Sequence, residues 1–131
     1  MLNSLLMVLL LAAPAAGPVV LHGQLVCSGC WTEADRDRVA YGTKADLECA
    51  ARCARDGLPA AIAVYADGRF TTYRLVLESS GLVDRRLTWI GRPVEVRGTL
   101  GEDGKGTFLR VQSLTGTTWE SLGFPTGPPE R

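Results

Sequence analysis

The chain is organised around CSGCWTEADRDRVAYGTKADLECAARC, residues 27–53, which contains all four cysteines of the protein. Cys27 and Cys30 enclose a Ser-Gly turn, whereas Cys49 and Cys53 are separated by three residues. Residues four apart in sequence lie one turn above each other on the same face of a helix. The stretch therefore predicts that a turn and a helix bring four sulfur atoms into one site.

The second cysteine pair lies in TKADLECAARCARDG, residues 43–57, which carries strong helix signals. Thr43 is a favourable N-cap residue, and Asp46 occupies the third position of the helix. Gly57 lies where a left-handed residue commonly ends a helix. We predict a helix from about Ala45 to Asp56. The preceding residues lack a clean period, so we expect a loop there with one helical turn around Glu33 to Arg38.

Strand signals lie on both sides of this stretch. VVLHGQLVC, residues 19–27, is rich in β-branched and apolar residues and predicts a first strand that bends at Gly23. In PAAIAVYADGRFTTYRLVLE, two extended runs meet at Asp67-Gly68, which is a strong hairpin signal. RPVEVRGTL and GTFLRVQSL alternate apolar and polar residues around the turn GEDGKG, so we expect a second hairpin.

Between the two hairpins, Leu82, Val83, Leu87 and Ile90 are spaced for one apolar face of a short helix that ends at Gly91. Strand, insertion, hairpin, helix and hairpin is the element order of the OB-fold. We therefore predict a mainly β fold with one inserted helix, an OB-fold-like five-stranded barrel. The alternative is a small open β-sandwich with a docked helix.

The chain divides into three parts by composition. Residues 1–16, MLNSLLMVLLLAAPAA, are apolar and end in small residues, which is typical of a secretory signal peptide, although no Lys or Arg precedes the apolar run. Residues 17–115 are predicted to form the OB-like domain, with a Cys-bearing insertion at about 28–57, and residues 116–131 a C-terminal tail. We expect a soluble periplasmic or secreted protein without a transmembrane segment in the mature chain; an uncleaved, membrane-tethering N-terminal segment is the alternative.

The overall charge argues against two classes of partner. The 131 residues contain 14 basic and 14 acidic side chains, so the formal net charge is zero. Nucleic acids and anionic membranes attract proteins through a positive field, which this composition does not supply. We predict no nucleic-acid partner.

Across roughly Gly23 to Leu77 the chain resembles small secreted bacterial proteins of no settled function. The resemblance is carried by a strand, a Cys followed by an aromatic residue (Cys30-Trp31), the helix exit CAARCARDGLP and a hairpin with a DG turn. In that group an acidic residue can stand at the position of Cys27. The resemblance thus implies that a disulfide at Cys27 is not a general requirement, which favours a ligand role for these positions, and it supplies no catalytic residues.

The four cysteines have three alternative interpretations. As thiolates, Cys27, Cys30, Cys49 and Cys53 offer a soft metal ion such as zinc or copper four sulfur ligands, although the second pair is CxxxC and not CxxC. In an oxidising compartment they would form two disulfides, Cys27 to Cys53 and Cys30 to Cys49 or the reverse, because Cys49 and Cys53 on one helix face are poorly placed for a bridge to each other. A redox-active CSGC pair ranks third, since no helix start is evident directly after it.

Other polar residues argue for a binding or structural module and against an enzyme. His22 is the only histidine and is expected to be a surface or structural residue, so no Ser-His-Asp set is available. Glu33, Asp35 and Asp37 alternate with arginines, as in a solvated loop. Asp46 is explained by helix capping. We predict a module of the cell envelope.

Aromatic residues provide one further alternative. Trp31, Tyr65, Tyr73 and Trp89 would suit a flat ligand such as heme on the barrel, although packing in the core is the commoner role of such side chains. The protein would then be a carrier of heme or another small ligand.

Overall fold

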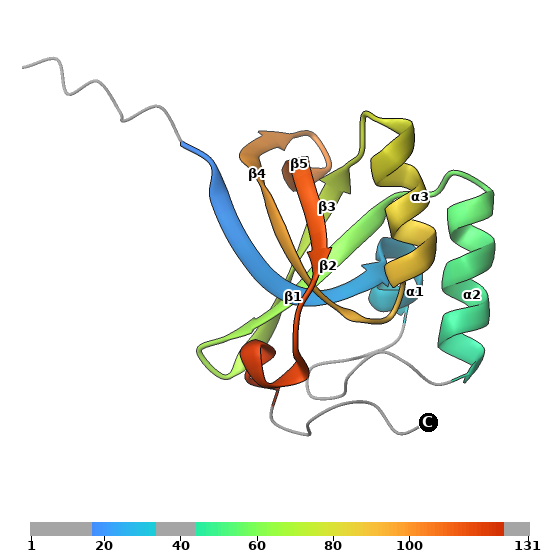
Figure 1. The fold of residues 1–131 in the computed structure, drawn as a ribbon, viewed down its shortest axis with the longest axis horizontal. Coiled ribbons are helices and arrows are strands. Elements are labelled where there is room, and N and C mark those ends of the chain that lie inside the picture. Colours follow the sequence, from blue (N-terminus) through green and yellow to red (C-terminus); the bar gives the residue numbers. More distant parts are fainter. Residues whose placement is uncertain (1–16, 34–43, 125–131) are drawn as a thin grey trace, which may run out of the picture.

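The computed structural model describes residues 17–33 and 44–124, in which five strands close into a barrel. The predicted signal peptide, residues 34–43 and residues 125–131 lie outside the described part. The elements in chain order are β1 (Val19–Cys27), α1 (Ser28–Glu33), α2 (Lys44–Arg55), β2 (Ala60–Ala66), β3 (Arg69–Val76), α3 (Ser80–Trp89), β4 (Pro93–Asp103), β5 (Gly106–Gly116) and a 3-10 turn η1 (Trp119–Leu122). Figure 1 shows α2 and α3 beside each other on one side of the barrel.

The strand order around the barrel is β1-β2-β3-β5-β4, and β4 pairs again with β1. All neighbouring strands are antiparallel except β3 and β5, which pair in parallel over three residue pairs. The mainly β, OB-like barrel predicted from the sequence is confirmed. The open-sandwich alternative is wrong, because the β3–β5 and β1–β4 pairings leave the sheet without an open edge.

The long strand β1 is shared by two partners and bends between them. Its residues 19–24 pair with β4 and its residues 24–27 pair with β2. The predicted bend at Gly23 falls at this change of partner, where an added Cβ would collide with the backbone of Ala63. The next residue, Gln24, is fully buried, and its side-chain amide donates a hydrogen bond of 3.0 Å to the carbonyl of Gly91. The bend thus requires glycine and is held by a buried polar contact.

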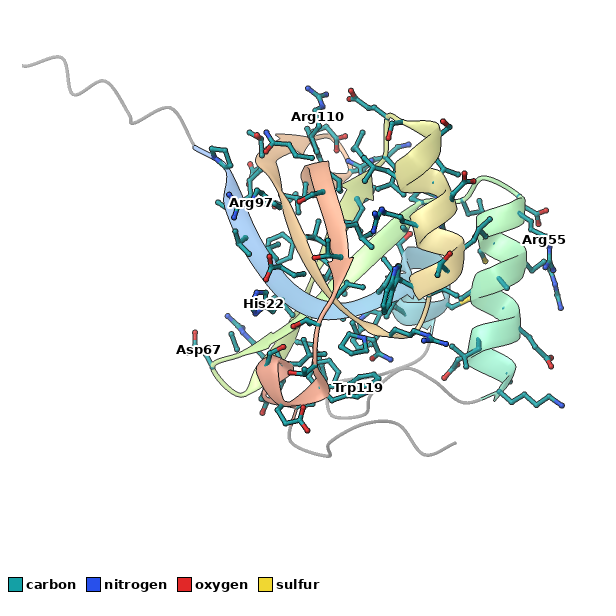
Figure 2. All side chains as sticks on the ribbon, in the orientation of Figure 1. His22, Arg55, Asp67, Arg97, Arg110 and Trp119 are labelled. Carbon is teal, nitrogen blue, oxygen red and sulfur yellow. A yellow bond between two sulfur atoms is a disulfide. The ribbon has the colours of Figure 1, made fainter. Side chains whose placement is uncertain are left out.

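The hairpin between β2 and β3 has the predicted two-residue turn. Asp67 (φ 54°) and Gly68 (φ 79°) both adopt left-handed conformations, as the twist of a tight hairpin requires. Figure 2 shows Asp67 at the tip of this hairpin. The Asp-Gly prediction is confirmed.

The second hairpin has a shorter turn than GEDGKG predicts. Strands β4 and β5 run on to Asp103 and Gly106, which leaves only residues 104–105 outside the ladder. One oxygen of Asp103 accepts a 2.8 Å hydrogen bond from the backbone N–H of Lys105, and the other pairs with the guanidinium of Arg74. These contacts of Asp103 stabilise the end of the hairpin. Most of the polar residues predicted to form the turn therefore belong to the two strands.

Helix α2 agrees with its prediction to within one residue at each end. It covers Lys44–Arg55, and Gly57 follows in a left-handed conformation (φ 73°). The predicted cap Thr43 lies outside the described residues. Ala50 is fully buried against the barrel, where its small side chain permits a close approach. Within the part of the chain that the structure describes, no helix has the length and apolar character needed to cross a membrane.

Helix α3 forms as predicted but presents a different face to the barrel. Val83 and Leu87 are 43% and 46% exposed. The face that packs inward carries Leu82, Arg86 and Ile90, which are four residues apart, and Arg86 is only 6% exposed. The predicted apolar face is therefore wrong for Val83 and Leu87, because the long basic side chain of Arg86 occupies an inward position of the helix.

The barrel interior is filled by aliphatic side chains from all five strands. The buried residues there are Leu25, Ala60, Ile62, Leu75, Val94, Val96, Leu109, Val111 and Leu114. A second cluster, Val26, Cys27, Ala50, Ala61 and Ala63, lies between the barrel and α2. Residues 117–124 also join the folded part, because Leu122 and Phe124 are buried beside Tyr65 and Phe70. The small residues of the second cluster leave space for the sulfur atoms.

Candidate functional site

Cys27 is the most deeply placed of the four cysteines. It is the last residue of β1, it pairs in register with Ala60 of β2, and its side chain is fully buried. The other fully or nearly fully buried residues of its cluster under α2 are aliphatic, and Trp31 and Phe70 pack against the same cluster. The β1–β2 ladder therefore fixes one sulfur in an apolar environment.

Cys30 is carried by α1, a short helix that sequence reasoning did not place. The helix begins at Ser28, directly after β1, whereas we expected a turn there and a helical turn only around Glu33 to Arg38. Long-range contacts hold it: the backbone N–H and hydroxyl of Ser28 both donate to the carbonyl of Pro59 (3.3 and 3.1 Å), and Trp31 packs edge-on against Phe70 at 5.2 Å. A helix therefore starts within CSGC, contrary to the prediction.

Helix α2 supplies the remaining two sulfurs. Cys30 forms a disulfide with Cys49, across 19 positions of sequence. This bridge belongs to the first of the two predicted pairings, and it is not the pairing that a redox-active CSGC motif would use. Cys27 and Cys53 remain free.

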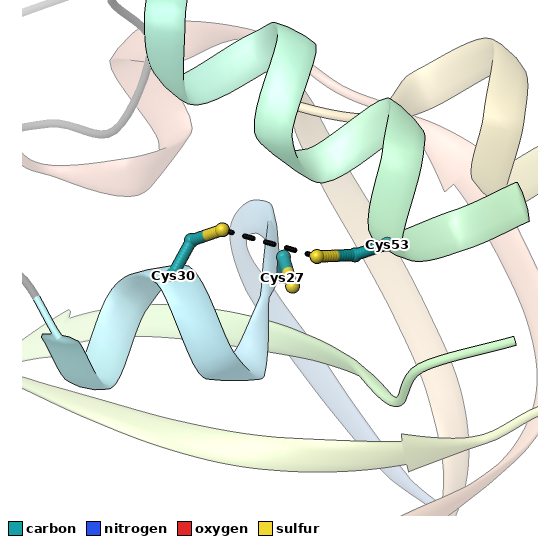
Figure 3. Close-up of side chains that lie close together, drawn as sticks. All are labelled: Cys27, Cys30 and Cys53. Carbon is teal, nitrogen blue, oxygen red and sulfur yellow. Dashed lines mark hydrogen bonds between the residues drawn. The ribbon is translucent and has the colours of Figure 1, made fainter. Parts of the chain in front are cut away.

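The free thiols lie next to the bridge. The sulfurs of Cys27, Cys30 and Cys53 are all within 4.8 Å of one another, and the sulfur of Cys53 is 4.0 Å from that of Cys30 (Figure 3). Because bridged Cys30 has no thiol proton, Cys53 is the donor in this contact. With Cys49 bonded to Cys30, the convergence of all four sulfurs is confirmed. We call these four residues the sulfur centre.

The surroundings of Cys53 act on its thiol in opposite directions. Burial raises the pKa of the Cys53 thiol above its usual value of 9.0, and the hydrogen bond and charge of Cys27 raise it further. The positive charge of Arg86 lowers this pKa. At neutral pH Cys53 is therefore a thiol, with a cation close enough to favour its thiolate when the proton leaves.

Arg86 is a residue of the site that sequence reasoning missed. It is 6% exposed on α3, which packs beside α2. Its positive charge lowers the pKa of the Cys53 thiol, so Arg86 acts on the sulfur centre. The spacing could have indicated this position, because Arg86 lies four residues from both Leu82 and Ile90 and so shares their face of the helix.

The other polar candidates lie away from the sulfur centre or outside the described residues. His22 forms a cross-strand pair with Glu95 (2.9 Å), both side chains being 40% exposed, and Figure 2 places His22 across the barrel from α2. Asp35 and Asp37 lie outside the described part, and Asp46 lies in the first turn of α2. Within residues 17–33 and 44–124, the group of metal-ligating atoms at this site consists of sulfurs alone.

The aromatic candidates are distributed over different parts of the surface. Trp31 and Tyr65 both contact the ring of Phe70. Trp89 instead lines an open pocket of about 860 Å³ beside η1, and Tyr73 lines another of about 760 Å³. The heme alternative therefore gains no shared aromatic face from these side chains.

Comparisons of the chain with protein-family models, curated proteins and solved structures found no match.

Proposed function

We propose that the protein is an exported binding module of the cell envelope whose sulfur centre holds a soft metal ion, Zn²⁺ or Cu⁺, when its bridge is reduced. The observation that carries the proposal is the convergence of Cys27, Cys30 and Cys53 within 4.8 Å. Two sulfurs bound to one zinc at about 2.3 Å in tetrahedral geometry lie about 3.8 Å apart. The 4.0 Å between Cys30 and Cys53 is close to that value.

Cys49 would be the fourth ligand. Its sulfur is bonded to Cys30, so reduction of the bridge leaves four thiols in one place. Four thiolates suit Zn²⁺, and soft thiolates also select Cu⁺. The apolar packing around Cys27 limits access of water, and the charge of Arg86 would offset part of the negative charge of a zinc–thiolate site.

A second candidate is a purely structural centre with two disulfides. It is favoured by the Cys30–Cys49 bridge and by the hydrogen bond between Cys27 and Cys53, which places a second pair side by side. Such bridges are typical of oxidising compartments, and the bridge also supports export of the chain. In this case the module would be stapled and would bind no metal at the sulfurs.

The test is a metal titration of the reduced, folded protein against a competing chelator. We expect one equivalent of Zn²⁺ or Cu⁺ per chain, and an affinity that falls in acid because protons compete for the thiolates. Cys27→Ser should weaken binding by on the order of 100-fold or more, since it removes a direct ligand. His22→Ala is the matched control, because it deletes the only histidine but lies across the barrel.

The two candidates give different results in protein recovered from its native compartment. Four retained thiols with bound metal support the metal site. A mass lower than that of the thiol form by about four hydrogens, without metal, supports two disulfides. A reduced, folded protein that takes up no metal would refute the metal site.

A further inference from the structure

The third sulfur of the centre lies within reach of the bridge. Cys53 is a free thiol 4.0 Å from the sulfur of Cys30, which is itself bonded to Cys49. Reacting atoms at about 3–3.5 Å are in near-attack position, so a small side-chain movement of Cys53 is sufficient. Cys49 and Cys53 are one turn apart on α2, and both can therefore face Cys30 without displacing the helix.

We propose that Cys53 is the internal nucleophile of a thiol–disulfide exchange that moves the bridge along α2. The thiolate of Cys53 attacks the sulfur of Cys30; the Cys30–Cys53 bond forms and the Cys30–Cys49 bond breaks. Cys49 leaves as a thiolate and takes up a proton from solvent, which replaces the proton that Cys53 released. The chain has one bridge before and after the step, so no external oxidant or reductant is needed.

The positions of the three sulfurs favour this step. Cys27 donates to or accepts from Cys53 and lies within 4.8 Å of both other sulfurs, which keeps Cys53 inside the centre. The positive charge of Arg86 partly offsets the burial that raises the pKa of the attacking Cys53 thiol. The cysteines of α2 thus become interchangeable partners of Cys30.

This inference deepens the proposed function, and only its consequence for metal binding depends on that function. In the metal-binding interpretation the metal binds after the bridge is reduced, so exchange decides which α2 cysteine, Cys49 or Cys53, is a free thiol before that reduction. The exchange itself requires no metal.

The experiment maps the bridge in native, metal-free protein kept in chelator without reductant. The protein is quenched in acid to stop exchange, denatured, and alkylated, and its peptides are analysed by mass spectrometry. Trypsin cleaves after Arg52 and so separates Cys49 from Cys53. We expect two isomers, one with Cys53 alkylated and one with Cys49 alkylated. Separated in acid and returned to about pH 8, each should relax to the same mixture.

Two variants identify the nucleophile. Cys53→Ser should give a single isomer in which Cys49 is never alkylated; Cys53→Ala replaces it if the serine variant does not fold. His22→Ala, which lies across the barrel from α2, is the control and should still give both isomers. Cys27 and Cys30 share one tryptic peptide, so the alkylated cysteine of α2 identifies each isomer.

A native protein in which Cys49 always remains bridged would overturn the exchange, and a Cys53→Ser variant in which Cys49 is still alkylated would overturn Cys53 as the nucleophile. Either result is obtained without metal. Failure of the metal titration therefore leaves the exchange standing, and failure of the exchange leaves the metal site to be judged by its own titration.

Discussion

Removing the bridge between α1 and α2 should lower the free energy of unfolding by roughly 3 kcal/mol. Cys30 and Cys49 are 19 positions apart. In the chain-entropy model, closing a loop of about 20 residues removes about 11 cal/mol/K from the unfolded state, which is roughly 3 kcal/mol at 25 °C. The perturbation is the double variant Cys30→Ser/Cys49→Ser, because replacing Cys49 alone would leave Cys30 free to pair with Cys53.

The assay is urea unfolding of the metal-free protein, followed by far-UV circular dichroism. For small proteins the slope is about 1–3 kcal/mol/M, so the midpoint should fall by about 1–3 M. Wild-type protein in excess reductant should lose a similar amount. Cys27→Ser, which leaves the bridge intact, is the control for the loss of a buried sulfur.

A bridge that mass analysis shows to be intact, but whose removal changes the free energy of unfolding by less than about 1 kcal/mol, would refute this reasoning. The unfolded state would then gain little freedom from opening the loop.

Two further predictions concern the barrel. Gly23→Ala should destabilise the fold by about 1–3 kcal/mol, because its Cβ would collide with the strand backbone opposite, whereas Gly104→Ala, with open space around its Cβ, should have a much smaller effect in thermal unfolding. The hydrogen bond from Arg74 holds the pKa of Asp103 below its usual value of 3.8, so this carboxylate stabilises the fold above that pH and its contribution disappears as pH falls through the lowered value. Asp103→Asn should therefore be less stable than wild type at neutral pH and equal to it in strong acid; a difference that persists in acid would contradict this.

Local signals were sufficient for much of the barrel. The strand Val19–Cys27 and the Asp67-Gly68 turn were predicted at the bounds that the structure has, and α2 to within one residue. Each depends on interactions between residues close in sequence: β-branched preference, left-handed turn residues and a glycine helix stop. The closed OB-like topology followed from the order of these elements.

Helix α1 could not be predicted in this way. The Ser-Gly-Cys run has no local preference for a helix, and its start depends on Pro59, thirty-one residues away, and on the ring of Phe70. The same holds for the inward position of Arg86, where a polar residue interrupts the apolar pattern of α3.

The sequence by itself determined that four sulfurs would meet, because a turn and one face of a helix are separated by a single connection. The sequence left two disulfide pairings open. The spacing of the cysteines limits the distances along the chain, but it does not decide which sulfur faces which across the two helices. Tertiary structure decided that Cys30 faces Cys49, that Cys27 is buried beneath α2 and that Cys53 lies 4.0 Å from the bridge. The physical reason is that packing of α1 and α2 against the barrel, and not the spacing of the cysteines, sets the direction of each sulfur.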